Sequence, residues 1–103
     1  MNLVEVLIGA REKLGDGWCQ GSSSDLAGKV CAQIAIIKEI IPDTTKPYSQ
    51  DDLELYYEGL WAIRRQIPSG FKSIPEYNDD PNTSLEDIVM LFDKAIAELG
   101  GLV

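Results

Sequence analysis

The stretch KVCAQIAIIKEII, residues 29–41, decides the fold class. It is apolar nearly all round, and its β-branched side chains would also suit a buried strand. Its length of about a dozen residues exceeds that of most strands, and two alanines and the Lys38-Glu39 pair favour a helix. Pro42 would end that helix, because proline cannot continue it. We therefore predict a helix over 29–41 at the centre of an all-α protein.

On the N-terminal side, residues 3–14 have the pattern of an amphipathic helix with Asn2 as its N-cap. Its apolar residues recur at spacings of three and four: Leu3, Val6, Leu7, Ala10 and Leu14. The following segment is rich in glycine, serine and aspartate, which favour turns. We expect an ordered loop there or a short hairpin over 17–30.

On the C-terminal side, a third helix is predicted to begin at Ser49 and to run to Ile67. Acidic residues near its start and Arg64-Arg65 near its end match the helix dipole. Gly59 in the middle costs about 1 kcal/mol relative to alanine, so we expect another backbone or a bulky ring against it. The apolar seam of this helix is Leu53, Tyr56, Leu60, Ile63 and Ile67, with Tyr57 and Trp61 beside it.

Residues 68–82 are predicted to be an irregular connector, and Thr83 and Glu86 match a capping box that opens a fourth helix ending at Leu99. The glycines at 100 and 101 would form its C-cap. Its predicted core stripe is Leu85, Ile88, Phe92, Ala95 and Leu99, with Val89 and Ile96 alongside. The expected fold is one compact four-helix domain over 1–103, with two long connectors and a radius of gyration of about 13 Å.

The charge balance limits the partners. Seventeen acidic and nine basic residues give a net charge of −8, and residues 43–103 carry −7 of it. Such a chain repels nucleic acid, and Arg64-Arg65 is the one adjacent basic pair. No apolar run reaches the ~18 residues of a membrane span, so we expect a cytoplasmic protein that binds neither nucleic acid nor membrane. The acidic half would either steer a basic partner or serve solubility alone.

Several chemistries lack their usual residues. The sequence has no histidine, the commonest general base and zinc ligand. Cys19 and Cys31 are too few for a tetrahedral zinc site, and we predict no metal and no cofactor. We interpret the two thiols as packing the loop around Trp18 on the helix that follows. Glu76, Asp79 and Asp80 would suit a divalent cation, but an Asx-turn at Asn78 or Asp79, shaping the corner at Pro81, is favoured.

Aromatic residues gather on the third helix and its flanks. Tyr56 and Trp61 lie about 140° apart around a helix, so one face cannot hide the whole set. An aromatic side chain left exposed among carboxylates would form a hot spot with an acidic rim. The predicted partner-binding residues are Asp51, Asp52, Glu54, Tyr57, Glu58 and Trp61.

Two blocks resemble a small uncharacterised family of bacterial and phage proteins. The first is GWCQG at 17–21 with the segment from Cys31 to Ile36; the second is Tyr77-Asn78-Asp79 and the final helix. The family usually has tryptophan where this chain has Tyr77 and glycine where it has Ile34. The resemblance implies a single compact domain and brings no known activity.

The leading hypothesis is a non-enzymatic protein-interaction module that binds its partner through the acidic second half. Its sharper form is a phage-encoded inhibitor of a host nucleic-acid-binding defence complex. The alternative is a ligand-binding or catalytic domain that uses two segments together: Trp18, Cys19 and Gln20 with Tyr77, Asn78 and Asp79. A homodimer through the apolar seam of the third or fourth helix is a further hypothesis.

Overall fold

The computed structural model describes residues 2–21, 29–42 and 45–100, and within them the chain forms an all-α globule. Four longer helices correspond to those predicted, and a short fifth one lies in the second connector. No strand occurs within these ranges. The radius of gyration is 12.8 Å, close to the expected value. The helices are α1 (Leu3–Asp16), α2 (Ala32–Ile40), α3 (Gln50–Arg64), α4 (Ile74–Asp79) and α5 (Leu85–Glu98).

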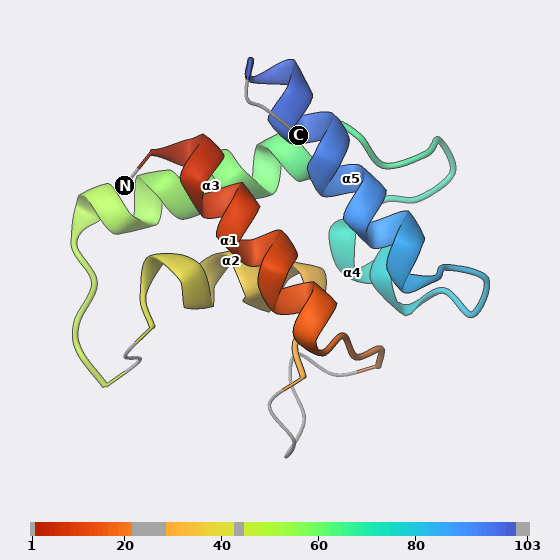
Figure 1. Cartoon of the computed structure of the whole chain (residues 1–103), viewed down its shortest axis with the longest axis horizontal. Helices are drawn as coiled ribbons and strands as arrows, with labels where there is room; N and C mark the ends of the chain where they lie inside the picture. Colours follow the sequence, from red (N-terminus) through yellow and green to blue (C-terminus); the bar gives the residue numbers. More distant parts are fainter. Residues whose placement is uncertain (1, 22–28, 43–44, 101–103) are drawn as a thin grey trace.

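Helix α1 packs against three of the other four helices. Asn2 caps it as predicted, with Glu5 completing a capping box. The helix contacts α2, α3 and α5, and Figure 1 shows it crossing in front of α2 and α3 with α5 beside it. Its fully buried residues are Val6, Leu7, Ala10 and Leu14, four of the five predicted.

Helix α2 is shorter and less buried than predicted. It begins at Ala32, because the Cys31 thiol takes the N-cap position and accepts a bond from the Ile34 amide. Ile34, Ile37 and Ile40 are only half-buried, so the helix is not enclosed on all sides. An apolar face that is half covered by neighbouring elements looks the same in sequence as one that is fully enclosed.

Of the two alternatives for the connector between α1 and α2, an ordered loop or a short hairpin, its described part does not form the hairpin. A single parallel bridge joins Trp18 to Val30, whereas a hairpin would pair antiparallel strands. The Val30 amide donates to the Gly17 carbonyl at 2.9 Å, and the Cys19 amide donates to the Val30 carbonyl at 3.1 Å. Residues 22–28, where a hairpin turn would fall, lie outside the described residues.

Helix α3 begins after the predicted cap, Ser49, which forms a capping box with Asp52. Helical geometry ends at Arg64, and the chain continues through turns to Ile67. A Cβ added at Gly59 would lie 3.0 Å from Ile36 Cγ2. The close approach that we predicted at Gly59 is therefore present, but an isoleucine side chain of α2 makes it, not a ring or a backbone.

The second connector and α5 differ from the sequence prediction in detail. The segment 68–82 contains α4, which Ser73 caps and in which Pro75 occupies the first turn. The capping box of α5 is Ser84 with Asp87, one residue later than predicted; Thr83 is buried, and its amide donates to the Asp80 carbonyl. The core stripe shifts as well: Leu91 is buried and Leu99 is 43% exposed.

Candidate docking surface

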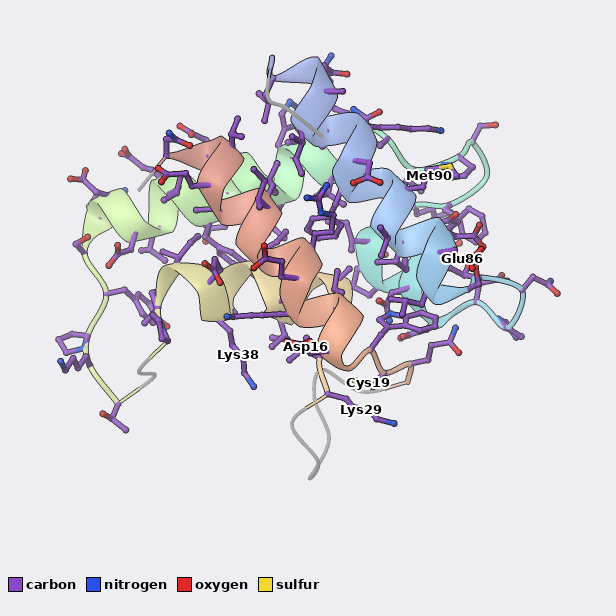
Figure 2. All side chains as sticks on the ribbon, in the orientation of Figure 1. Asp16, Cys19, Lys29, Lys38, Glu86 and Met90 are labelled. Carbon is purple, nitrogen blue, oxygen red and sulfur yellow. The ribbon has the colours of Figure 1, made fainter. Side chains whose placement is uncertain are left out.

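The structure brings together the two segments that the resemblance singled out. Trp18, Cys19 and Gln20 follow α1, and the second segment lies in α4, about sixty residues later. Figure 2 places Cys19 on the connector beyond the end of α1, next to Lys29. That position agrees with the bond between the Cys19 amide and the neighbouring Val30 carbonyl.

Asn78 joins these segments. Its side chain is 1% exposed, and Oδ1 accepts from Trp18 Nε1 at 2.8 Å and from the Ala32 amide at 3.0 Å. Its Nδ2 donates to the Cys19 carbonyl at 3.1 Å and to Asp79 Oδ1 at 2.9 Å. A side-chain amide offers two donors and two acceptor positions, so all four are in use. The amide is saturated by the protein itself.

Gln20 strengthens the same junction from the other side. Its Nε2 donates to the Asn78 carbonyl at 3.0 Å and to the Asp80 carbonyl at 2.9 Å. The Gly21 amide donates to Asp79 Oδ1 at 2.9 Å. A hollow of about 280 Å³ lies beside these groups, but the side-chain amide of Asn78 and Nε2 of Gln20 are already bonded within the protein. The arrangement fastens two connectors together and leaves a ligand few free partners.

The predicted Asx-turn at the Pro81 corner exists, but another residue makes it. Asp80 Oδ1 accepts from the Asn82 amide at 2.8 Å, and the Asp80 carbonyl accepts from the Thr83 amide at 3.0 Å. Asn78 and Asp79 are instead engaged with the first connector. The choice of Asn78 or Asp79 for this turn was therefore wrong.

The two cysteines form no disulfide, and both are half-buried. Cys31 Sγ accepts from the Ile34 amide at 3.4 Å and thereby caps α2. Among the described residues no group of three or more carboxylate or thiol side chains is placed to hold a metal ion.

Tyr77 occupies an apolar, acid-flanked position beside the network. Its ring packs edge-on against Phe71, with the ring centroids 4.8 Å apart. Burial raises the pKa of its hydroxyl above the ordinary value of 10.0, and the carboxylates of Asp87 and Asp80 raise it further. The phenol therefore keeps its proton to a higher pH than a free tyrosine does.

The predicted partner-binding residues lie on two flanks of α3. The four carboxylates line a hollow of about 380 Å³ together with Ile40 and Leu55, and we call this the acidic hollow. Its carboxylates are Asp51, Asp52, Glu54 and Glu58. Asp52 also belongs to the capping box, since its Oδ2 accepts from the Ser49 amide at 3.0 Å.

The predicted aromatic pair lies on the other flank. Tyr57 is 62% and Trp61 is 60% exposed, and both line a second hollow of about 260 Å³ beside Leu60, Ile74 and Pro75. Tyr56 is half-buried, and its hydroxyl accepts from Gln33 Nε2 at 3.0 Å. The helical geometry thus separates Tyr56 from Trp61 as predicted.

Arg64 was missed as a member of this surface. It lines the second hollow with Tyr57 and Trp61, and its Nη2 donates to the Lys72 carbonyl at 2.9 Å. From the sequence, Arg64 was expected to complement the helix dipole and to belong to the one adjacent basic pair, but not to line this surface. Its position three residues after Trp61 was the available signal.

Fold and site together describe an all-α protein with an exposed acidic and aromatic helix. The chain belongs to a family of unknown function (DUF6197), whose model matches residues 1–98. No curated protein and no solved structure gives a significant match. Within the described residues, no helix has the length and apolar character needed to cross a membrane.

Proposed function

We propose that this protein is a non-enzymatic interaction module that binds a basic segment of a protein partner at the acidic hollow of α3. The observation that carries the proposal is the combination of apolar lining residues with exposed carboxylates that have no partner in the part of the chain that the structure describes. Ile40 and Leu55 are the apolar lining residues. Asp51, Glu54 and Glu58 are exposed and make no hydrogen bond or ion pair with any described residue.

This composition suits a lysine or arginine side chain. The aliphatic stem of such a residue covers apolar surface while its charged end stays among oxygen atoms. Here the stem would lie on Ile40 and Leu55, and the charge would meet the carboxylates at the rim. The negative field of residues 43–103, which carry −7, would also speed the approach of a basic protein.

We do not propose nucleic acid as the direct partner. Binding it requires lysine and arginine side chains to displace the counterions of the phosphates, and a protein with a net charge of −8 is instead repelled by the phosphates. A narrower form holds that the partner's basic surface is one that itself binds nucleic acid. The carboxylates would then stand where phosphates otherwise bind, and duplex DNA would compete with this protein for the partner.

The alternative of a ligand or catalytic site at Trp18 and Asn78 is less well supported. The side-chain amide of Asn78 is fully used by protein groups. A substrate would have to break those bonds to use it, which costs about 1–3 kcal/mol for each buried group left unpaired.

Affinity capture from native-host lysate with charge-neutralised variants tests the proposal. One variant combines Asp51→Asn, Glu54→Gln and Glu58→Gln; the control combines Glu12→Gln, Asp16→Asn and Glu86→Gln, three exposed acids elsewhere. Both remove the same charge. Exposed charge pairs contribute about 0.2–1 kcal/mol each, so we expect the first variant to bind about tenfold more weakly at low salt and the control to match wild type. Equal binding by both variants would contradict the proposal.

A further inference from the structure

Four exposed residues form a line along the outward face of α3, from the acidic hollow to the aromatic flank. They are Glu54, Tyr57, Trp61 and Arg64, which we call the α3 stripe. Their spacings of three, four and three residues keep them on one side of the helix. An acid stands at one end, a base at the other, and two aromatic rings stand between them. Among the described residues, no other helix presents two exposed large aromatic side chains.

The spacing of the stripe reads the same in both directions. If a second copy of α3 lies antiparallel across a two-fold axis, Glu54 of each copy faces Arg64 of the other, and Tyr57 faces Trp61. A two-fold interface requires such self-complementarity. A parallel pairing would set like charges opposite each other and is disfavoured. We propose that the α3 stripe is a homodimer interface in which two copies of this helix pack antiparallel.

The local structure of the stripe suits this packing. The hollow beside Tyr57 and Trp61 has Leu60 and Ile74 among its lining residues, so a ring from the second copy would meet apolar side chains. The bond from Arg64 Nη2 to the Lys72 carbonyl holds the guanidinium at the edge of that hollow. A guanidinium has five N–H donors, which leaves others to face the second copy's Glu54. Glu54 makes no hydrogen bond or ion pair with any described residue.

The size of the stripe predicts a reversible dimer. A large aromatic side chain buries 150–250 Å²; because Tyr57 and Trp61 are 62% and 60% exposed, the four rings of two copies would bury roughly 500 Å². Specific interfaces begin at about 1,000 Å², so the rings supply about half of that minimum and the flanking side chains must supply the rest. The expected dissociation constant is micromolar.

The inference goes beyond the proposed function and does not depend on it. Asp51, Asp52 and Glu58 lie off the stripe on the opposite flank, so a dimer leaves most of the acidic hollow open. Glu54 borders both surfaces. A dimer would present two acidic hollows to a partner, which raises its apparent affinity for a partner with two basic segments.

Sedimentation equilibrium from ~1 μM to ~1 mM, a range that brackets a micromolar dissociation constant, tests the dimer through charge exchange. Glu54→Arg alone sets two bases opposite each other, and Arg64→Glu alone sets two acids opposite each other; we expect each to weaken self-association at least tenfold. An equimolar mixture of the two variants restores opposite pairs, and so does the double variant E54R/R64E. Both should associate like wild type. All four residues are exposed, so the variants should keep the helical circular dichroism of wild type.

Two results would overturn the inference. If the wild-type protein stays monomeric up to ~1 mM, the interface does not exist. If the single variants associate as strongly as wild type, the protein dimerises through another surface. Asp51→Arg changes the same charge off the stripe and should leave self-association unaltered, while it weakens partner capture. A monomeric protein whose partner capture still depends on Asp51 would refute the dimer and leave the proposed function standing. A dimeric protein whose partner capture does not depend on Asp51 would support the dimer and refute the proposed function.

Discussion

Replacing Asn78 by leucine removes the amide network while keeping a side chain of the same branched shape. The apolar side chain fills the space, so water has little room to replace the lost bonds. Asn78→Leu leaves the Ala32 amide, Trp18 Nε1 and the Cys19 carbonyl without their present partner. Two of these groups come from the connector between α1 and α2, and the third is the amide of the first residue of α2, so we expect the loss to separate that connector and the start of α2 from α4.

The cost follows from how deeply each group is buried. The Ala32 bond is buried, and an unsatisfied buried donor costs about 1–3 kcal/mol. The Trp18 and Cys19 bonds are only part-buried, so each lost bond costs about 0.5–1 kcal/mol. The sum is about 3 kcal/mol, a large share of the 5–15 kcal/mol typical of a domain. It corresponds to a fall in Tm of roughly 10–20 °C.

Urea denaturation followed by circular dichroism measures the change in the free energy of unfolding. Asn82→Leu is the matched control, because Asn82 is exposed and the bond at this position uses its backbone amide. We expect the control to stay within about 0.5 kcal/mol of wild type. A loss below about 1 kcal/mol for Asn78→Leu, or equal losses for the two variants, would refute the view that this network holds the connectors together.

Three further predictions concern other contacts. A Cβ at Gly15 would meet open space, so Gly15→Ala should raise the free energy of unfolding by about 0.5–1 kcal/mol. A Cβ at Gly59 would lie 3.0 Å from Ile36. The free energy of unfolding of Gly59→Ala should therefore be at least about 1 kcal/mol lower than that of Gly15→Ala. Equal gains in urea denaturation would mean that α2 and α3 are not closely packed. Because the pKa of Tyr77 is raised, the unfolded chain releases the proton first as the pH passes 10.0. The free energy of unfolding therefore keeps this contribution below pH 10.0 and loses it as the pH rises further. Tyr77→Phe should lose less unfolding free energy than wild type at alkaline pH, and an equal loss in the two proteins would contradict this. Cys31→Ala removes the cap of α2 and should cost about 1 kcal/mol, while Cys31→Ser should keep the cap; equal thermal melting temperatures for the two variants would rule the cap out.

Local signals predicted those parts of the fold that local chemistry determines. Asn2 and Ser49 cap their helices as expected, because each is followed three residues later by an acid that completes a capping box. The start of α5 was predicted one residue too early because two neighbouring residues, Thr83 and Ser84, both match this pattern. In the folded protein Ser84 is the cap, while Thr83 is buried and its amide donates to the Asp80 carbonyl.

Longer-range features could not be predicted from the pattern alone. The sequence marked the two segments that Trp18 and Asn78 join, but nothing in either segment says that an indole would donate to that amide. The acidic and aromatic residues of α3 were also identified, yet their division between two flanks depends on where α2 and α4 pack. The same packing had to be known before Arg64 could be placed beside Tyr57 and Trp61.

Isothermal titration of the captured partner, once purified, tests the central claim most directly. Wild type, the variant with Asp51→Asn, Glu54→Gln and Glu58→Gln, and the control neutralised at Glu12, Asp16 and Glu86 are compared at low and high salt. We expect the acidic-hollow variant to bind about tenfold more weakly at low salt, and we expect this difference to shrink at high salt. The control should match wild type throughout. A partner that binds all three proteins equally at low salt would contradict the claim that the acidic hollow is the docking site.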